Sequence, residues 1–366
     1  MITILLQKIL AALTQLLGDI KTKLNTIKDN LDDLIVVATA AGPIASFSTN
    51  LSRPLLSCIV DIPESISGTD TVVVTQTGAN LADASIVYPE YPEVTEDGKT
   101  CRKVTCGSSK TVTLKFKPNT QYTVKMSAKC VTNGTPTVDS RGFVFFYSDN
   151  SQSYINFGKV SADWTDYTLT STSGKSIVAV GTFTSDWRLN IFVDNSKFML
   201  VEGTTATAYE PYTATTKTVS LPQNVYGGEV DVISGKITKT YEADDLGDLS
   251  WSYESDVGYF YSDSITDIKS GSENCLCDSG YTYDEALSVN KTFTVSGKQI
   301  MFRDDTYSAA PDFKTAVTGI DFIYELAEAD TDSITPEVIT ALNGVNNIFS
   351  DSGNVIVEYL KLYKEV

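Results

Sequence analysis

The stretch YTVKMSAK, residues 122–129, alternates apolar and polar side chains at every second position. A period of two is that of a β-strand with one buried and one solvated face. TVTLKF at 111–116 and WRLNIFVDN at 187–195 repeat the pattern, and Asn133-Gly134 is typical of a tight turn between strands. Many short strands separated by turns predict a β-sandwich or jelly roll in this part of the chain.

Composition extends this prediction to the whole chain. The length of 366 residues suggests two or three domains, and 42% hydrophobic with 20% charged residues is typical of a globular protein rich in strands. The net charge of −18 argues against nucleic acid and against an anionic membrane surface as partners, because both are bound through Lys and Arg clusters. We therefore expect a mainly β protein with neither partner.

The first 36 residues have a different period. Apolar residues recur there at alternating spacings of three and four, which is the heptad of a coiled coil. The heptad positions are Leu6, Leu10, Leu13, Leu17, Ile20, Leu24, Ile27, Leu31 and Leu34. Leu at one core position and Ile at the other favour more than two strands, so we expect a homotrimer. The alternative is a single amphipathic helix packed on its own domain. The segment lacks the basic start and cleavage site of a signal peptide, so no targeting signal is expected.

Four segments follow from these patterns. They are a coiled-coil oligomerisation and docking helix at 1–36, an adaptor linker at 37–55, a jelly-roll domain at 56–212 and a C-terminal β domain at 213–366. The stretch at 40–62, rich in Gly, Pro and Ser, has the pattern of neither a helix nor an ordinary strand. TPEVITALNG at 335–344 predicts one short helix in the last segment, since Thr, Pro and Gly stand at its N-cap, first and last positions.

Several stretches also carry a family resemblance. YTVKMSAKC, DWTDYTLT and FVDNSKFMLVEGTTATAYEPY (192–212) resemble the jelly-roll carbohydrate-binding domain of virion proteins from tailed bacteriophages. LPQNVYGGEVDVISGKIT (221–238) and the stretch at 321–361 are similar to the C-terminal module of the same proteins. The resemblance implies a tail, baseplate or head-fibre protein of the virion, with other virion proteins and host-surface polysaccharide as partners.

Catalytic chemistry has little support in the sequence. Because the chain has no histidine, Ser-His-Asp and Cys-His sites and His-bearing zinc sites are excluded. The six cysteines lack the spacing of a zinc ribbon or a disulfide framework, and no glycine-rich phosphate loop is present. We expect no enzyme activity and no cofactor. A glycoside hydrolase stays open as an alternative, since it needs only two carboxylates, and calcium held by the acidic stretch at 242–285 is a weaker one.

Sugar binding without cleavage fits the residue types better. Aromatic rings stack on pyranose faces while short polar side chains bind hydroxyl groups. FFYSDNSQSY and SDWRLN supply six candidate residues: Tyr147, Asp149, Asn150, Tyr154, Trp187 and Arg188. The alternative for each is a packing role, and Trp164 in DWTDY is expected in the core.

Together, these observations predict a trimeric phage virion protein that recognises or adheres to a host-surface glycan. A purely structural head fibre, decoration or baseplate connector is the main alternative. A polysaccharide hydrolase is the other.

Overall fold

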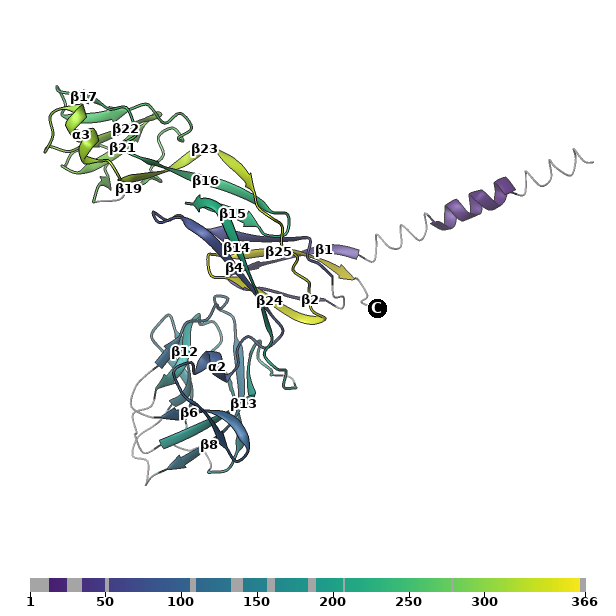
Figure 1. Ribbon diagram of the computed structural model, residues 1–366. Coiled ribbons are helices and arrows are strands. Elements are labelled where there is room, and N and C mark those ends of the chain that lie inside the picture. Colours follow the sequence, from purple (N-terminus) through teal and green to yellow (C-terminus); the bar gives the residue numbers. More distant parts are fainter. Residues whose placement is uncertain are drawn as a thin grey trace, which may run out of the picture.

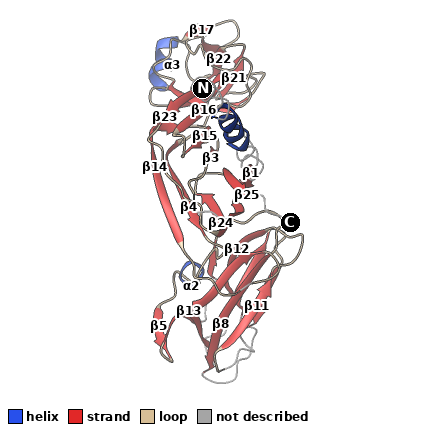
Figure 2. Ribbon diagram, turned by 90° about the vertical axis from the view of Figure 1, so that its right-hand side faces the viewer, coloured by secondary structure: helices blue, strands red, loops and turns tan. Residues whose placement is uncertain are grey.

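The computed structural model describes residues 13–24, 35–49, 53–105, 110–132, 141–156, 162–183, 189–206, 208–277 and 280–362. The fold is mainly β, as predicted, with antiparallel pairing in all but one of the paired strands of these ranges. Figures 1 and 2 show a central β body with one lobe at each end.

The central body, called here the central sandwich, consists of two sheets. The seven-stranded sheet has the order β1 (Ile35–Gly42), β25 (Val355–Leu362), β3 (Ser57–Ile62), β15 (Gly228–Asp231), β16 (Lys236–Asp245), β23 (Asp321–Ser333) and β19 (Leu276–Cys277). The four-stranded sheet has the order β14 (Ala214–Val225), β4 (Thr69–Thr77), β24 (Gly344–Ser350) and β2 (Ala45–Thr49). Alternate residues of β4, such as Val72 and Val74, are buried in the core that the two sheets share.

The lobe that follows β4, called the inserted sandwich, pairs a four-stranded with a five-stranded sheet (Figure 2). The first has the order β10 (Gln152–Asn156), β9 (Arg141–Tyr147), β12 (Ile177–Phe183) and β7 (Lys110–Val112). The second has the order β11 (Thr165–Thr170), β8 (Tyr122–Thr132), β13 (Leu189–Glu202), β6 (Lys99–Thr105) and β5 (Glu93–Glu96), and helix α2 (Ala84–Val87) packs beside them. In β8, Tyr122, Val124, Met126 and Ala128 are fully buried, as predicted for the core face. The other face is not solvated as expected, because Thr123, Ser127 and Lys129 are buried as well.

The other lobe, called the distal lobe, carries a small sheet with an aromatic core. Its strands are β17 (Ser252–Glu254), β18 (Tyr259–Ser262), β22 (Gln299–Arg303), β21 (Thr292–Ser296) and β20 (Thr282–Tyr283), with helix α3 (Ala310–Ala316) against them. The rings of Phe260 and Phe313 stack at 4.1 Å between centroids. Trp251 donates from its indole to the carbonyl of Leu246 at 2.8 Å and thus anchors a loop.

Both lobes are insertions into the central sandwich. The chain leaves at Thr77 and returns at Ala214, which is its direct partner in the β4–β14 pair. It leaves again at Asp245 and returns at the paired Asp321. The four predicted segments follow one another along the chain. In the structure, however, β3 and β4 (residues 57–77) pair with β25 and β24 from the last third of the chain. The predicted segment boundaries therefore stay a prediction.

Three local predictions differ from the structure. Residues 40–62, expected to be irregular, contain β2, β3 and the end of β1. The strand expected over 111–116 ends at Val112. The helix expected at 335–344 is an extended segment, because its backbone groups bond to other elements: the N–H of Glu337 donates to Val232 and the N–H of Ala341 to Arg53, each at 2.8 Å. The short helix of this region is α3 instead, which begins near Pro311.

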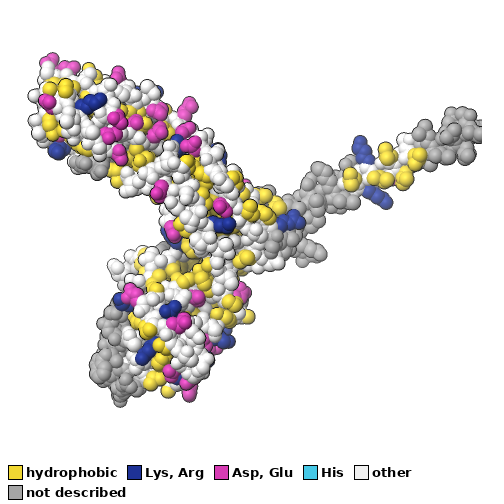
Figure 3. All heavy atoms as spheres, viewed as in Figure 1, with side chains coloured by type: hydrophobic (Ala, Val, Ile, Leu, Met, Phe, Trp, Pro, Cys, Tyr) yellow, Lys and Arg dark blue, Asp and Glu magenta, His cyan; other side chains and the backbone are white. Residues whose placement is uncertain are grey.

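At the N-terminus, residues 13–24 form a helix whose apolar side chains face solvent in the single chain (Figure 3). The heptad residues Leu13, Leu17, Ile20 and Leu24 are 54% to 72% exposed. The other five heptad residues, Leu6, Leu10, Ile27, Leu31 and Leu34, lie outside the described ranges. The coiled coil and the trimer stay predictions.

Candidate functional site

The outer face of the four-stranded sheet in the inserted sandwich carries a group of aromatic side chains. Phe143 and Phe145 of β9 point into the core, so the alternate residue Phe146 points outward. Across the ladder, Gln152 of β10 pairs with Phe146 and Tyr154 pairs with Val144, which places both on the outer face. Phe183 ends β12 on this face and is 39% exposed.

Arg141 organises this aromatic face. Its guanidinium carbon lies 4.2 Å from the ring centroid of Tyr154 and 5.3 Å from that of Phe183. One of its Nη groups donates to the side-chain oxygen of Gln152. Its Nε is buried and has no hydrogen-bond partner within the described ranges. The face therefore combines aromatic rings with a fixed cationic donor and an amide, the combination that binds a sugar ring and its hydroxyl groups.

The turn between β9 and β10 holds a second polar group, at the other end of β9 from Arg141. Asp149 accepts from the backbone N–H of Ser151 at 3.0 Å and forms a 2.8 Å ion pair with Lys175. The hydrogen bond from Lys175 and those from Ser151 hold the pKa of the Asp149 carboxyl well below its usual range. Asn150 has a φ of 64°, in the left-handed region that Asn tolerates. The turn thus presents a fixed, ionised acceptor.

The six predicted ligand-binding residues lie in different places. Tyr147 is only 2% exposed, and its hydroxyl contacts Ser153 Oγ at 2.8 Å and accepts from the N–H of Thr172 at 2.7 Å. Its ring belongs to the core and its hydroxyl joins β10 to the turn that follows β11. Asp149 and Asn150 are in the exposed turn, and Tyr154 is on the aromatic face. Trp187 and Arg188 lie outside the described residues, in the segment directly after Phe183.

Sequence reasoning missed three residues of the aromatic face, Arg141, Phe146 and Phe183. The alternation in RGFVFFY, residues 141–147, was the available signal for Phe146. Arg141 has the same parity as the buried Phe143 and Phe145, and its pairing follows a register shift in both ladders that the sequence does not show. Trp164 also differs from its expected core position: it is only half-buried, and its indole donates to Asp97 at 3.1 Å while Lys99 Nζ lies 4.2 Å from the ring centroid.

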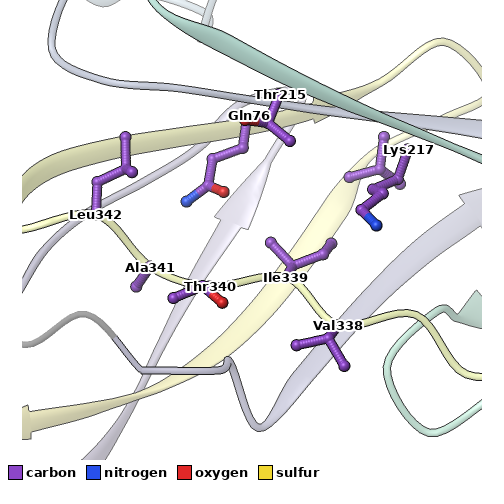
Figure 4. Close-up of a pocket in the computed structure, with 9 residues that line it drawn as sticks. Gln76, Thr215, Lys217, Val338, Ile339, Thr340, Ala341 and Leu342 are labelled. Carbon is purple, nitrogen blue, oxygen red and sulfur yellow. The ribbon is translucent and has the colours of Figure 1, made fainter.

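A separate hollow of about 270 Å³ lies at the edge of the central sandwich (Figure 4). Gln76, Thr215 and Lys217 from β4 and β14 face the extended segment 338–342 across it. Lys217 forms a 3.0 Å ion pair with Glu337 beside it. The segment that was expected to be a helix thus lines a groove beside β14, an edge strand of the four-stranded sheet.

The described residues contain no group of three or more His, Cys, Asp or Glu side chains placed to hold a metal ion. No helix within them has the length and apolar content needed to cross a bilayer.

Comparisons with known proteins give distant matches only. No family model and no curated protein matches the chain. Among solved structures, the tripod from the baseplate of bacteriophage Tuc2009 is 13% identical with a TM-score of 0.25, over 83% of this chain and 99% of that one. A tandem CBM22 domain from a Paenibacillus barcinonensis xylanase is 11% identical with a TM-score of 0.23, over 85% and 98%.

A Clostridium thermocellum xylanase comprising CBM22 and GH10 modules, complexed with xylohexaose, is 13% identical with a TM-score of 0.22. The match covers 44% of this chain and 30% of the xylanase chain. At these TM-scores the similarity is coarse, so the functional argument rests on the residues of this chain.

Proposed function

We propose that this chain is a virion protein of a tailed phage that binds a glycan on the host surface through the aromatic face of the inserted sandwich. The binding breaks no bond. The sandwich acts as a jelly-roll carbohydrate-binding domain, and the N-terminal helix trimerises and docks the protein on other virion proteins.

The observation that supports this most directly is the arrangement around Arg141. Tyr154 and Phe183 flank the guanidinium on the outer face, and Gln152 accepts from it. Half-exposed rings beside polar groups that are already fixed in place bind a sugar with little loss of side-chain entropy. The sequence resemblance to carbohydrate-binding domains of phage virion proteins supports the same class of ligand.

Trimerisation would raise the strength of a weak site. The helix at 13–24 exposes a row of leucine and isoleucine side chains, which other copies of the chain would cover. Three linked sites on one particle bind a repetitive polysaccharide with a high effective concentration, so that modest single-site affinity is sufficient.

The test uses an array of bacterial surface glycans and the full-length chain. Tyr154→Ala and Phe183→Ala each remove one ring from the aromatic face, and Tyr259→Ala removes a half-buried ring from the distal lobe as the matched control. Loss of a stacking ring costs about 0.5–1.5 kcal/mol, so each face variant should bind about 2- to 12-fold more weakly per site. The control should bind as the wild type does.

Folding of each variant is verified by its thermal transition. Unchanged binding by both face variants, or no glycan bound by the wild type, would refute the proposal. Assembly defects without glycan affinity would instead indicate a structural spacer. Release of reducing ends from a bound polysaccharide would indicate a hydrolase.

A further inference from the structure

A second hollow, of about 250 Å³, is lined by residues of β14, of β16 and of the turn that joins β14 to β15. It is lined by Gln223, Asn224, Tyr226, Lys239, Tyr241, Glu242 and Ala243. Its size is a little below the roughly 300 Å³ at which pockets for drug-sized ligands begin, and is suitable for a single sugar ring.

Two irregularities in strand pairing form this hollow. Between Ser220 and Val225 the register of β14 against β4 shifts, so that residues 221–224 have no partner across the ladder. Between Lys239 and Tyr241 the register of β16 against β23 shifts as well. Bulges of this kind redirect side chains out of the regular sheet pattern. The two register shifts lie next to the hollow, and residues of both β14 and β16 line it.

Tyrosine rings supply the apolar part of the lining. Tyr241 is 5% exposed and packs over Gly227, where a Cβ atom would stand 2.6 Å from a ring carbon. A glycine is thus required for the ring to lie where it does. The half-buried Tyr226 adds a second ring with a hydroxyl group. The ring of Tyr226 is therefore the surface on which the C–H face of a pyranose can pack, and the buried Tyr241 forms a fixed wall of the hollow.

The polar lining has unused hydrogen-bonding capacity. Within the described part of the chain, the side chains of Gln223, Asn224 and Glu242 make no hydrogen bond, and neither does the hydroxyl of Tyr226. Two amides, a carboxylate and a phenol together offer both donors and acceptors, as vicinal sugar hydroxyl groups require. Two other lining residues are less available: Tyr241 is buried, with the Glu64 carboxylate near enough to add to the rise in its pKa that burial causes, and Lys239 pairs with Asp330 at 2.7 Å and Asp332 at 3.4 Å.

The charge around the hollow limits the class of ligand. The only cation in the lining, Lys239, is neutralised by two aspartates. Burial raises the pKa of Glu242, and the negative charges of Asp267 and Asp244 add to the shift. Figure 3 shows Asp and Glu side chains gathered over the distal lobe and toward this junction. Such surroundings repel phosphate and uronate groups.

We infer that this hollow is a second binding site, for a neutral monosaccharide unit. The class of ligand is that of the proposed function, but the site lies in the central sandwich and is separate from the aromatic face. One chain would then contact a host polysaccharide at two points.

Saturation-transfer NMR with glucose, galactose, rhamnose and N-acetylglucosamine, and with glucuronate as the anionic probe, tests the inference on the full chain. All measurements are made in the Tyr154→Ala background, which weakens the aromatic face. The double variant Gln223→Ala/Asn224→Ala removes two exposed amides that make no hydrogen bond within the described ranges and keeps the Cβ atom of Asn224 that packs on Gly68. Asn354→Ala removes an exposed amide that does not line the hollow and serves as the control.

At least one neutral sugar should give a saturable signal with a millimolar Kd. That signal should fall at least fivefold in the double variant and be unchanged in the control. No signal from any of the four sugars, an equal signal in the double variant, or glucuronate binding as strongly as glucose would each overturn the inference. Because the aromatic face is weakened by Tyr154→Ala in every sample, a negative result for the hollow says nothing against glycan binding at the aromatic face. A negative result on the glycan array for the aromatic-face variants likewise says nothing against the hollow.

Discussion

Replacing Asn346 by Ala should be among the most destabilising single changes in the central sandwich. Asn346 is fully buried on β24, and its amide makes four hydrogen bonds. Its oxygen accepts from Gln76 at 2.9 Å and from the N–H of Leu342 at 2.7 Å. Its nitrogen donates to the carbonyls of Leu342 at 2.9 Å and Gly344 at 3.1 Å. These bonds hold the extended segment 338–342 against the sheet.

The expected cost follows from what each partner loses. A net hydrogen bond contributes about 0.5–1.5 kcal/mol, and a buried partner left without one costs about 1–3 kcal/mol. Water can reach the half-exposed carbonyls near Gly344, whereas Gln76 is 6% exposed and stays buried. We therefore expect Asn346→Ala to lower the free energy of unfolding by about 3–4 kcal/mol.

Urea denaturation with several spectroscopic probes measures this change and reveals whether the lobes unfold separately. Asn354→Ala, at an exposed site, should change the free energy of unfolding by less than about 0.5 kcal/mol. A double-mutant cycle with Gln76→Ala should show a coupling of about 1 kcal/mol, because the two amides share one hydrogen bond. A loss below about 1 kcal/mol for Asn346→Ala would refute the role assigned to it.

Three further predictions concern other parts of the chain. Because the pKa of Glu242 is raised in the folded protein, its contribution to stability is present below the ordinary value of 4.5 and is lost as the pH rises. Glu242→Gln should therefore raise the free energy of unfolding at pH 7 by less than about 1 kcal/mol after solvent screening, which gives a slightly higher Tm at pH 7 but not at pH 4; a lower Tm at pH 7 would contradict this. Tyr88→Phe removes a buried hydroxyl that donates to the Gly142 carbonyl at 3.0 Å, which should cost about 1–2 kcal/mol in thermal unfolding; no loss would count against that bond. Light scattering should find a trimer for the full chain and a monomer for a version that begins at Ile35, whereas a monomeric full-length chain would exclude the coiled coil.

Local sequence patterns predicted individual strands better than they predicted how the strands pack together. The alternation in YTVKMSAK predicted β8 and its core face, because apolar residues at every second position are visible in any short window. It did not predict that Thr123, Ser127 and Lys129 on the other face are buried too. The segment 335–344 satisfies every local rule for a helix, yet Ile339 and Ala341 are buried in the central core and the segment is extended. Tertiary contacts outweighed helix propensity there, and no local signal reports them.

The candidate site was predicted only in part for a similar reason. Tyr154 and the turn at Asp149 were found from residue type, but Tyr147 has the same residue type and is buried. The face that a side chain occupies depends on strand register, which follows from pairing partners distant in sequence. Phe183 and Arg141 pair across β12 and β9, forty-two positions apart by their numbers (183 − 141), so their contact is not visible in either stretch alone.

The place of β25 in the seven-stranded sheet affects how the protein is made. Within the described ranges β25 lies between β1 and β3, so the strand that follows the N-terminal helix is joined to the sheet only through a strand that is synthesised much later. Each lobe has its own core and ends that meet, and can fold during synthesis, whereas the central sandwich must wait for β25. A ribosome that stops before Val355 would release a chain with formed lobes and an unsealed sheet, whose open strand edges invite aggregation.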